Sequence, residues 1–401
     1  MEIIRTNYID ILWKYSLSRD IKIITGIRRI GKSTLLRQYA NFLKQDKNIS
    51  TNNIITYDFN NQIILGKLTW EVLINSVLTH INKSKEKFYL FIDEVQELKD
   101  WQKAIKTLFE NGDINIDIYL TGSNSQTLST DISTWFTGRH ININLLPINF
   151  NELCESQILK PTANDIRRYL NFGGMGKIVP FYNDDAIVKQ SLKTIIDDAI
   201  YKDVFKRYKI KSKDVFEKIF KYVFDNVGKE FSCKNVAEIL HLNFRTIVNH
   251  LNWLENANII LPISYFEVKG KRILKTNKKY YASDLGVLSS VDGYDTNIGW
   301  KLENLVLLVL LSKYDNVYTY KNYNGKQVDF VCEKDKTLVY VQVTKFLIEK
   351  NEENSNWERE IGNLESIRDS YEKICICLDN DSQILNSGVK IINVLDWIKN
   401  F

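Results

Sequence analysis

Cysteines are few in this chain, and their pattern excludes two kinds of structural site. The five are odd in number and none forms a Cys-x-x-Cys pair: Cys154, Cys233, Cys332, Cys375 and Cys377. Neither a disulfide framework nor a zinc site is therefore indicated, and a reducing cytosol fits this usage. Cys375 and Cys377 alternate along an apolar run, so we expect both on one face of a strand, packed in the core.

Long apolar runs are also missing. No stretch of about 18 consecutive apolar residues occurs, and the first residues lack the charged-then-apolar pattern of a secretory signal. We therefore expect a soluble cytoplasmic protein without a membrane segment. The 44% of hydrophobic and 26% of charged residues are ordinary for a globular chain. A length of 401 residues predicts more than one domain.

The net charge of the chain is small, and it comes from one segment. The chain has 54 Lys and Arg residues against 49 Asp and Glu residues. Residues 212–282 hold twelve of the former and seven of the latter, which accounts for the whole net charge of +5. If the chain binds an acidic partner such as DNA, this segment is therefore the expected place for it.

Between Ile21 and Pro147 short β-rich runs alternate with helical ones. The continuous apolar runs at residues 88–92 and 116–120 indicate central strands that are covered on both faces. This alternation predicts an α/β domain with a parallel sheet and crossover helices. We place it at residues 1–155 and expect a helical lid or connector at residues 156–211.

Residues 26–33 read Gly-Ile-Arg-Arg-Ile-Gly-Lys-Ser and match G-x-x-x-x-G-K-[ST] between a strand and a helix. Glycines let backbone N–H groups surround a phosphate chain, and the helix N-terminus adds positive potential. We expect Lys32 at the terminal phosphates and Ser33 at Mg²⁺. Arg28 and Arg29 occupy variable positions, where attraction for an anion and simple solvation are both open. The predicted ATP-binding residues are Gly26, Ile27, Arg28, Arg29, Ile30, Gly31, Lys32, Ser33, Thr34, Asp93 and Ser123.

The apolar strand predicted at residues 88–92 ends in an acidic pair, Asp93 and Glu94. Asp93 is expected to hold Mg²⁺ through water, and Glu94 to orient or deprotonate the attacking water. A solvated acidic pair is the alternative. The next strand leads to Ser123 and Asn124, which we expect beside the terminal phosphate.

Gly138 and Arg139 precede a further apolar segment. Arg139 is a candidate for stabilising charge in the transition state, either in cis or from a neighbouring subunit. The second case implies a homo-oligomer. A structural arginine paired with a carboxylate is the alternative. The predicted catalytic residues are Lys32, Glu94, Asn124 and Arg139.

Four segments carry a family resemblance: GIRRIGKST, LFIDEVQELKDW, LTGSNS and GRHININLLPINF. Together they resemble the bacterial and archaeal AAA-family P-loop ATPases that have a C-terminal domain of unknown function. The resemblance spans nearly the whole chain, although its specific motifs lie in the first third. It implies an AAA+-type sheet with helices on both faces, and Mg²⁺-dependent binding and hydrolysis of ATP.

Residues 212–285 predict a winged-helix domain: three helices followed by a hairpin. The third helix buries one side and presents Arg and Asn side chains on the other, which suits entry into a major groove. A basic turn in the hairpin is suited to phosphate contact. DNA binding and a purely structural role as a lid or oligomer contact both stay open. The predicted DNA contacts are Arg245, Asn249, Asn252, Lys269, Lys271 and Arg272.

Residues 290–401 predict a small domain that resembles restriction-endonuclease-like folds. A buried helix bears Glu303 and a strand bears Asp329, but Gln342 and Thr344 stand where the active pattern has Glu and Lys. A glutamine adds no negative charge and a threonine supplies no cation, so we expect a degenerate site. Its remaining candidate ligands are Glu303, Asp329 and Gln342.

The leading hypothesis is therefore an ATPase that couples nucleotide state to the winged-helix and nuclease-like modules. A slow nucleotide switch that recognises DNA or a protein partner is the alternative. A metal-dependent nuclease is the second alternative.

Overall fold

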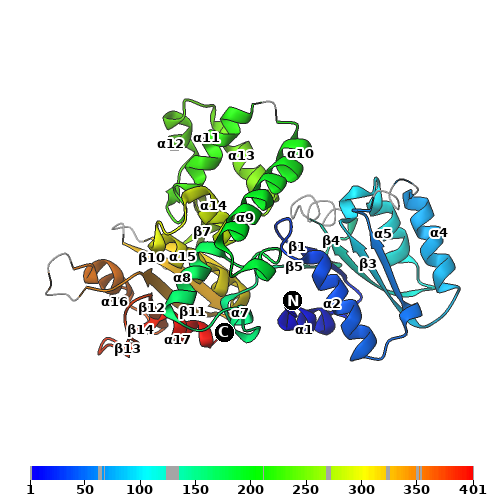
Figure 1. The fold of residues 1–401 in the computed structure, drawn as a ribbon, viewed down its shortest axis with the longest axis horizontal. Helices are drawn as coiled ribbons and strands as arrows, with labels where there is room; N and C mark the ends of the chain where they lie inside the picture. Colours follow the sequence, from blue (N-terminus) through cyan, green and yellow to red (C-terminus); the bar gives the residue numbers. More distant parts are fainter. Residues whose placement is uncertain are drawn as a thin grey trace. The chain divides into compact units, whose positions relative to one another are not determined.

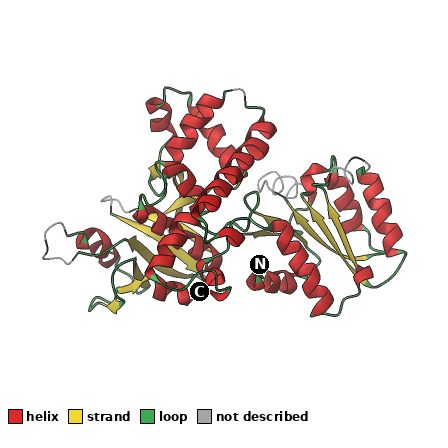
Figure 2. Ribbon diagram, viewed as in Figure 1, coloured by secondary structure: helices red, strands yellow, loops and turns green. Residues whose placement is uncertain are grey.

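The computed structural model describes two compact units, shown in Figures 1 and 2. The first contains Met1–Leu145 with the short segments Asp198–Asp203 and Asn256–Asn258, and the second contains Leu146–Asp197, Val204–Glu255 and Ile259–Phe401. The residues that the structure describes are 2–61, 66, 68–122, 135–210, 212–267, 272–321, 326–348, 352 and 355–400.

A five-stranded parallel sheet forms the centre of the first unit, in the order β2-β3-β4-β1-β5. Its strands are β1 (Ile21–Thr25), β2 (Ile54–Asp58), β3 (Lys87–Asp93), β4 (Asn115–Thr121) and β5 (His140–Asn144). Its helices include α1 (Thr6–Tyr15), α2 (Lys32–Gln45), α4 (Trp70–Ile81) and α5 (Trp101–Glu110). The predicted α/β domain with a parallel sheet is confirmed.

Both faces of this sheet are covered because its central strands are apolar on both sides. Leu90 and Ile92 of β3 belong to one core cluster with buried residues of α4 and α5. On the other face, Phe91 stacks on Tyr119 of β4 with ring centroids 4.9 Å apart, and Tyr119 lies 5.2 Å from Tyr39 of α2. The continuous apolar runs in the sequence follow from this double burial.

A nine-stranded sheet forms the centre of the second unit, in the order β13-β14-β12-β11-β10-β9-β7-β8-β6. Its strands are β6 (Glu230–Phe231), β7 (Ile260–Glu267), β8 (Arg272–Ala282), β9 (Asn316–Lys321), β10 (Gln327–Lys334), β11 (Thr337–Thr344), β12 (Glu372–Cys377), β13 (Gln383–Ile384) and β14 (Lys390–Asn393). Hairpin strand β7 pairs in parallel with β9, so the strands expected in two separate domains lie in one sheet. Cys375 and Cys377 are buried on β12, as predicted.

The helices that follow residue 146 in the chain include α7 (Phe150–Glu155), α8 (Ala163–Phe172), α9 (Asp185–Ala199), the π-helical segment η4 (Ile200–Phe205), α10 (Lys206–Tyr208), α11 (Lys213–Phe224), α12 (Cys233–Ile239), α13 (Phe244–Asn256), α14 (Leu285–Asp292), α15 (Ile298–Lys313), α16 (Asn363–Glu365) and α17 (Val394–Lys399). Ser232 caps α12 by accepting a hydrogen bond from the Asn235 N–H. Among the described helices, none has the length and apolarity that a membrane crossing requires.

The glycine pair at the end of α8 is required by close packing. Gly173 has a φ of +67°, and a Cβ added to Gly174 would lie 1.8 Å from the Ile148 carbonyl oxygen. The buried Asp284 carboxylate accepts hydrogen bonds from the N–H groups of Gly174 and Gly286, both at 2.8 Å. Burial raises the pKa of Asp284 to about 6, although these hydrogen bonds act to lower it. This glycine pair therefore lies at a buried junction between α8 and α14.

Candidate nucleotide-binding site

The turn between β1 and α2 needs glycine at its first position. Gly26 has a φ of +147°, and a Cβ added there would lie 2.8 Å from the Leu145 carbonyl oxygen. Gly31 has a φ of +116° and precedes α2, and nothing lies within 4 Å of an added Cβ. Ile27 and Ile30 are buried, so only their backbone is available to a ligand. Close packing thus fixes the start of the turn at Gly26, whereas Gly31 leaves space for a ligand at the N-terminus of α2.

Lys32 begins α2 and folds back over this turn. Its Nζ donates hydrogen bonds to the carbonyl oxygens of Gly26 at 3.0 Å and Ile27 at 3.3 Å, and it lies 3.9 Å from Glu94 Oε1. Burial lowers the pKa of Lys32, and the nearby Glu94 carboxylate opposes that shift. The ammonium group is thus held by weak carbonyl acceptors that an anionic ligand can replace.

The side chains of Ser33 and Asp93 are in direct contact, as a joint role in binding Mg²⁺ requires. The Ser33 hydroxyl donates to Asp93 Oδ2 at 2.6 Å, and Thr121 at the end of β4 donates to Asp93 Oδ1. Burial raises the pKa of Asp93, although both hydroxyl hydrogen bonds act to lower it. A hydroxyl and a carboxylate are the oxygen ligands that Mg²⁺ prefers, so the donor set fits this ion.

Glu94 lies where the chain turns sharply out of β3. Its backbone is left-handed, with a φ of +51°, and its N–H donates to Thr121 Oγ1 at 2.9 Å. The Gln96 side-chain amide donates to Glu94 Oε2. Thr121 and Gln96 thus orient the acidic pair. Our sequence analysis did not include them, although each lies within three residues of a predicted site residue or strand end.

Both arginines of the turn pair with a carboxylate, so neither one points only into water, as one alternative proposed. Arg28 forms two hydrogen bonds with Asp203, at 2.9 Å from Nε and 2.7 Å from Nη2. Arg29 forms an ion pair with Asp198. Both acids belong to Asp198–Asp203, the short segment that lies in the first unit but is distant in sequence. Sequence spacing gave no signal for these two pairs.

A role for Arg139 in cis is wrong on geometric grounds. The Ile21 N–H at the start of β1 donates to the Arg139 carbonyl oxygen at 3.0 Å, whereas the phosphate-binding turn follows the other end of β1. The strand has five residues, which span about 17 Å at about 3.3 Å each. Arg139 is exposed and has no carboxylate partner within the described residues. Ser123 and Asn124 lie outside the described part of the chain.

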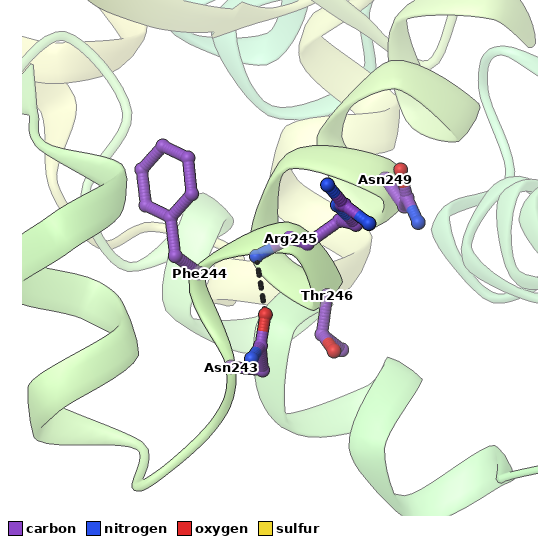
Figure 3. A pocket seen from close by; sticks show the side chains of 5 residues that line it. All are labelled: Asn243, Phe244, Arg245, Thr246 and Asn249. Atoms are coloured by element: carbon purple, nitrogen blue, oxygen red, sulfur yellow. Dashed lines mark hydrogen bonds between the residues drawn. The ribbon is translucent and has the colours of Figure 1, made fainter.

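Helix α13 presents the predicted polar face. Arg245, Asn249 and Asn252 are exposed, whereas Ile247 and Leu251 are buried. A shallow pocket of about 580 Å³ at its N-terminal end is lined by Asn243, Phe244, Arg245, Thr246 and Asn249. Figure 3 shows Arg245 directed toward Asn249 and away from Phe244, and the Asn243 side chain accepting from the Arg245 N–H at 2.8 Å. Lys269 and Lys271 lie outside the described residues, as does the side chain of Arg272.

The structure brings Glu303 of α15 and Asp329 of β10 to one buried lysine. Lys279 of β8 lies 3.2 Å from Glu303 Oε1 and 3.8 Å from Asp329 Oδ1, with a side chain that is only 2% exposed. Gln342 of β11 accepts from the Asp329 N–H and donates to Glu360 at 2.7 Å. The described residues contain no group of three or more His, Cys, Asp or Glu side chains arranged to hold a metal ion. Sequence analysis missed both Lys279 and Glu360.

The class of the first unit follows from its strand order and its site. A parallel sheet in the order β2-β3-β4-β1-β5, with the phosphate-binding turn after β1 and the acidic pair after β3, defines a P-loop ATPase domain of the AAA type. An AAA domain family matches residues 18–154, and a domain of unknown function, DUF8612, matches residues 163–298.

Two relatives extend over the whole chain. An uncharacterized protein of Haemophilus influenzae is 31% identical over 407 residues, which cover 98% of this chain and 98% of that protein. An uncharacterized protein of Methanocaldococcus jannaschii is 29% identical over 408 residues, covering 95% and 83%. The chain therefore belongs to the family of AAA-domain proteins that includes the Haemophilus influenzae protein.

Among solved structures, the Thermotoga maritima RuvB Holliday junction branch migration motor is similar over 66% of this chain and 91% of its own, with 15% identity and a TM-score of 0.32. The replication initiator DnaA bound to AMPPCP and single-stranded DNA covers 64% and 89%, with 16% identity and a TM-score of 0.35.

Proposed function

We propose that this protein binds ATP with Mg²⁺ in the turn of residues 26–33 and hydrolyses it. The observation that carries the proposal is the contact of Ser33 with Asp93, at 2.6 Å, beside Lys32 and Glu94. Bound Mg²⁺ would neutralise charge on the phosphates. These four side chains come from two adjoining places in the fold, the start of α2 and the end of β3.

Each of these residues has a separate task. Backbone N–H groups at the start of α2 receive phosphate oxygens, and Lys32 exchanges its carbonyl acceptors for the terminal phosphates. Ser33 and Asp93 would hold the metal ion. Glu94 orients a water molecule and accepts its proton, while Thr121 fixes the backbone of Glu94 and the carboxylate of Asp93.

Calorimetric titration with MgATP tests the binding step. Wild-type protein should bind with a measurable heat, and Lys32→Met should weaken binding at least about tenfold, since it removes a charged hydrogen-bond donor worth about 1.5–3 kcal/mol. Lys14→Met is the matched control because Lys14 is exposed on α1, away from the turn. Equal affinity in the wild type and Lys32→Met would refute the assigned site.

A second proposal concerns the segment that carries the excess positive charge. The order α11-β6-α12-α13-β7-β8, with β6 and β7 both paired to β8, supports a winged-helix domain. The exposed Arg245, Asn249 and Asn252 on α13 support contact with duplex DNA through this helix. Nucleotide state in the first unit would then act on a DNA-associated module.

Titration of labelled duplex DNA at several salt concentrations tests this proposal. The logarithm of the binding constant should fall linearly with the logarithm of salt concentration, because phosphate contacts release counterions. Arg245→Ala should weaken binding by about 1–3 kcal/mol, and Lys213→Ala on the exposed side of α11 serves as its control. Absence of salt-sensitive binding would favour a protein partner instead.

For the buried cluster around Lys279 we infer a role in stability rather than metal-dependent nuclease chemistry. Lys279 lies between the carboxylates of Glu303 and Asp329, where an ion would otherwise be needed to offset two negative charges. Mn²⁺ should therefore leave the wild-type melting temperature unchanged, and plasmid should stay intact with Mg²⁺ or Mn²⁺. Metal-dependent nicking that Asp329→Asn abolishes would contradict this inference.

A further inference from the structure

Arg28 forms a largely buried ion pair at the phosphate-binding turn. Its guanidinium donates from Nε and Nη2 to the two oxygens of Asp203, at 2.9 Å and 2.7 Å. The side chains are 17% and 3% exposed, respectively. A planar guanidinium that meets a carboxylate with two hydrogen bonds uses the same geometry with which arginine recognises a phosphate group. Asp203 therefore occupies the donors that a phosphate would use.

The charges around Arg28 are those of the proposed catalytic site. Burial lowers the pKa of Arg28, but the hydrogen bonds and charge of Asp203, followed by the charges of Glu94 and Glu97, outweigh it and the pKa is raised. For Lys32 the pKa is lowered by burial, raised by Glu94 and Asp203, and lowered again by Arg28. Arg28 is therefore within electrostatic reach of both Lys32 and Glu94, the residues expected to surround the terminal phosphate.

The segment that supplies Asp203 has an unusual backbone. Helix α9 gives way at Ile200 to the π-helical segment η4, whose hydrogen bonds join residues five apart. Asp198 and Asp203 are five residues apart, and each reaches one arginine of the turn. Short π-helical stretches occur frequently at functional sites. The winding of this segment thus brings two carboxylates to the two variable arginines.

We propose that Arg28 is a catalytic residue that contacts the terminal phosphate in cis, and that Asp203 holds its guanidinium until MgATP competes for it. This inference rests on the proposed ATPase function. The phosphate oxyanions and the Asp203 carboxylate are alternative acceptors for one donor group, so binding of ATP releases Asp203. Stabilisation of charge on the transferred phosphoryl group, which sequence analysis assigned to Arg139, then comes from the turn itself.

Release of Asp203 would also affect a segment of the chain that leads into the second unit. The chain continues from Asp198–Asp203 into the second unit in both directions, at Asp197 and at Val204. A change in the acceptor of Arg28 therefore acts on a segment that is covalently continuous with the second unit. This provides a physical route by which the second unit can respond to the nucleotide.

Arg37 on α2 provides a matched control outside the phosphate-binding turn. Its side chain is 59% exposed and that of its partner Glu2 is 44% exposed, so water screens this pair. Exposed pairs contribute at most about 1 kcal/mol. Arg37→Ala should therefore leave both nucleotide affinity and turnover close to those of the wild type, whereas changes to the buried Arg28–Asp203 pair should not.

Steady-state phosphate release and equilibrium binding of ATP and ADP in Arg28→Ala, Arg28→Lys, Asp203→Asn and Arg37→Ala test the proposal. Arg28→Ala should lower kcat by about 10²–10³-fold, the usual effect of removing one donor to transition-state charge, and Arg28→Lys should restore only part of it. ADP affinity should change little, which also shows that Arg28→Ala is folded. Asp203→Asn should bind MgATP more tightly than the wild type and keep its kcat.

Two outcomes overturn this proposal alone. Wild-type turnover in Arg28→Ala would remove Arg28 from catalysis and leave the ATPase function intact. Weaker ATP binding in Asp203→Asn, to the same degree as in Arg28→Ala, would make the pair a structural support instead of a competitor. Failure of the wild type to bind or hydrolyse ATP is distinguishable from both, because it overturns the proposed function and this inference together.

Discussion

The buried lysine of the second unit offers a sharp test of the structural account. Lys279→Met keeps most of the side-chain volume but leaves the Glu303 and Asp329 carboxylates facing each other without a cation. Removing one partner of a buried ion pair costs about 3–5 kcal/mol. The adjacent Lys278 pairs with Glu255 at 3.4 Å but is 36% exposed, so Lys278→Met should cost at most about 1 kcal/mol.

The stability that Lys279→Met loses should depend on pH in one direction. Burial raises the pKa of Asp329, Glu303 raises it further, and Lys279 lowers it. Because the pKa of the folded state lies above that of the unfolded chain, this group favours the folded state at low pH, and that contribution is lost as pH rises through the folded-state pKa. Without Lys279 the pKa rises further, so acid should reduce the deficit of Lys279→Met.

Urea unfolding at pH 7 and pH 5, followed by tryptophan fluorescence, provides the measurement. Lys279→Met should lose about 3–5 kcal/mol at pH 7 and less at pH 5, while Lys278→Met should lose at most about 1 kcal/mol at both. Equal losses in the two variants, or a larger deficit for Lys279→Met at pH 5, would refute the assignment of Lys279 as the buried counter-charge.

Three further predictions concern the site and the glycine junction. Ser33→Ala should reduce the gain in ATP affinity that Mg²⁺ provides, measured by titration with and without EDTA, and should leave metal-free binding within about twofold; an unchanged gain would separate Ser33 from the metal. Thr121→Val should lower kcat about tenfold or more, since Asp93 and the Glu94 backbone lose the same partner, and unchanged phosphate release would contradict this. Gly174→Ala should lower the free energy of unfolding by more than about 3 kcal/mol in urea, because its Cβ would lie 1.8 Å from the Ile148 carbonyl oxygen. Gly112→Ala is its control, because nothing lies within 4 Å of a Cβ added there. Equal stabilities of the two variants would contradict the packing described for Gly174.

The nucleotide-site residues that the structure brings together as expected are those whose positions depend on local sequence. Lys32 and Ser33 follow a strand and begin a helix, and Asp93 ends an apolar strand, so a linear pattern is sufficient to bring them together. Thr121 required the register of β4 against β3, in which Leu120 lies beside Ile92. Strand pairing is set by the whole sheet, and the motif alone does not specify it.

Contacts between distant segments account for what sequence analysis missed. Arg28 and Asp203 are 175 residues apart, so no spacing rule connects them. Sequence analysis found no cation at Thr344, whereas in the structure Lys279 of β8 reaches the carboxylates of Glu303 and Asp329. The shared nine-stranded sheet makes this contact possible, since hairpin β7/β8 pairs with β9 instead of forming a separate domain. The register of β5 against β1 likewise decides that Arg139 cannot act in cis.

The central claim is that Glu94 activates water beside a nucleotide held by Lys32, Ser33 and Asp93. Phosphate release by wild type and Glu94→Gln, measured together with MgATP affinity, tests it most directly. Glutamine keeps the shape but cannot accept the proton, so release should fall at least about 10²-fold while affinity changes less than about threefold. Equal rates of phosphate release in the two proteins would contradict the account.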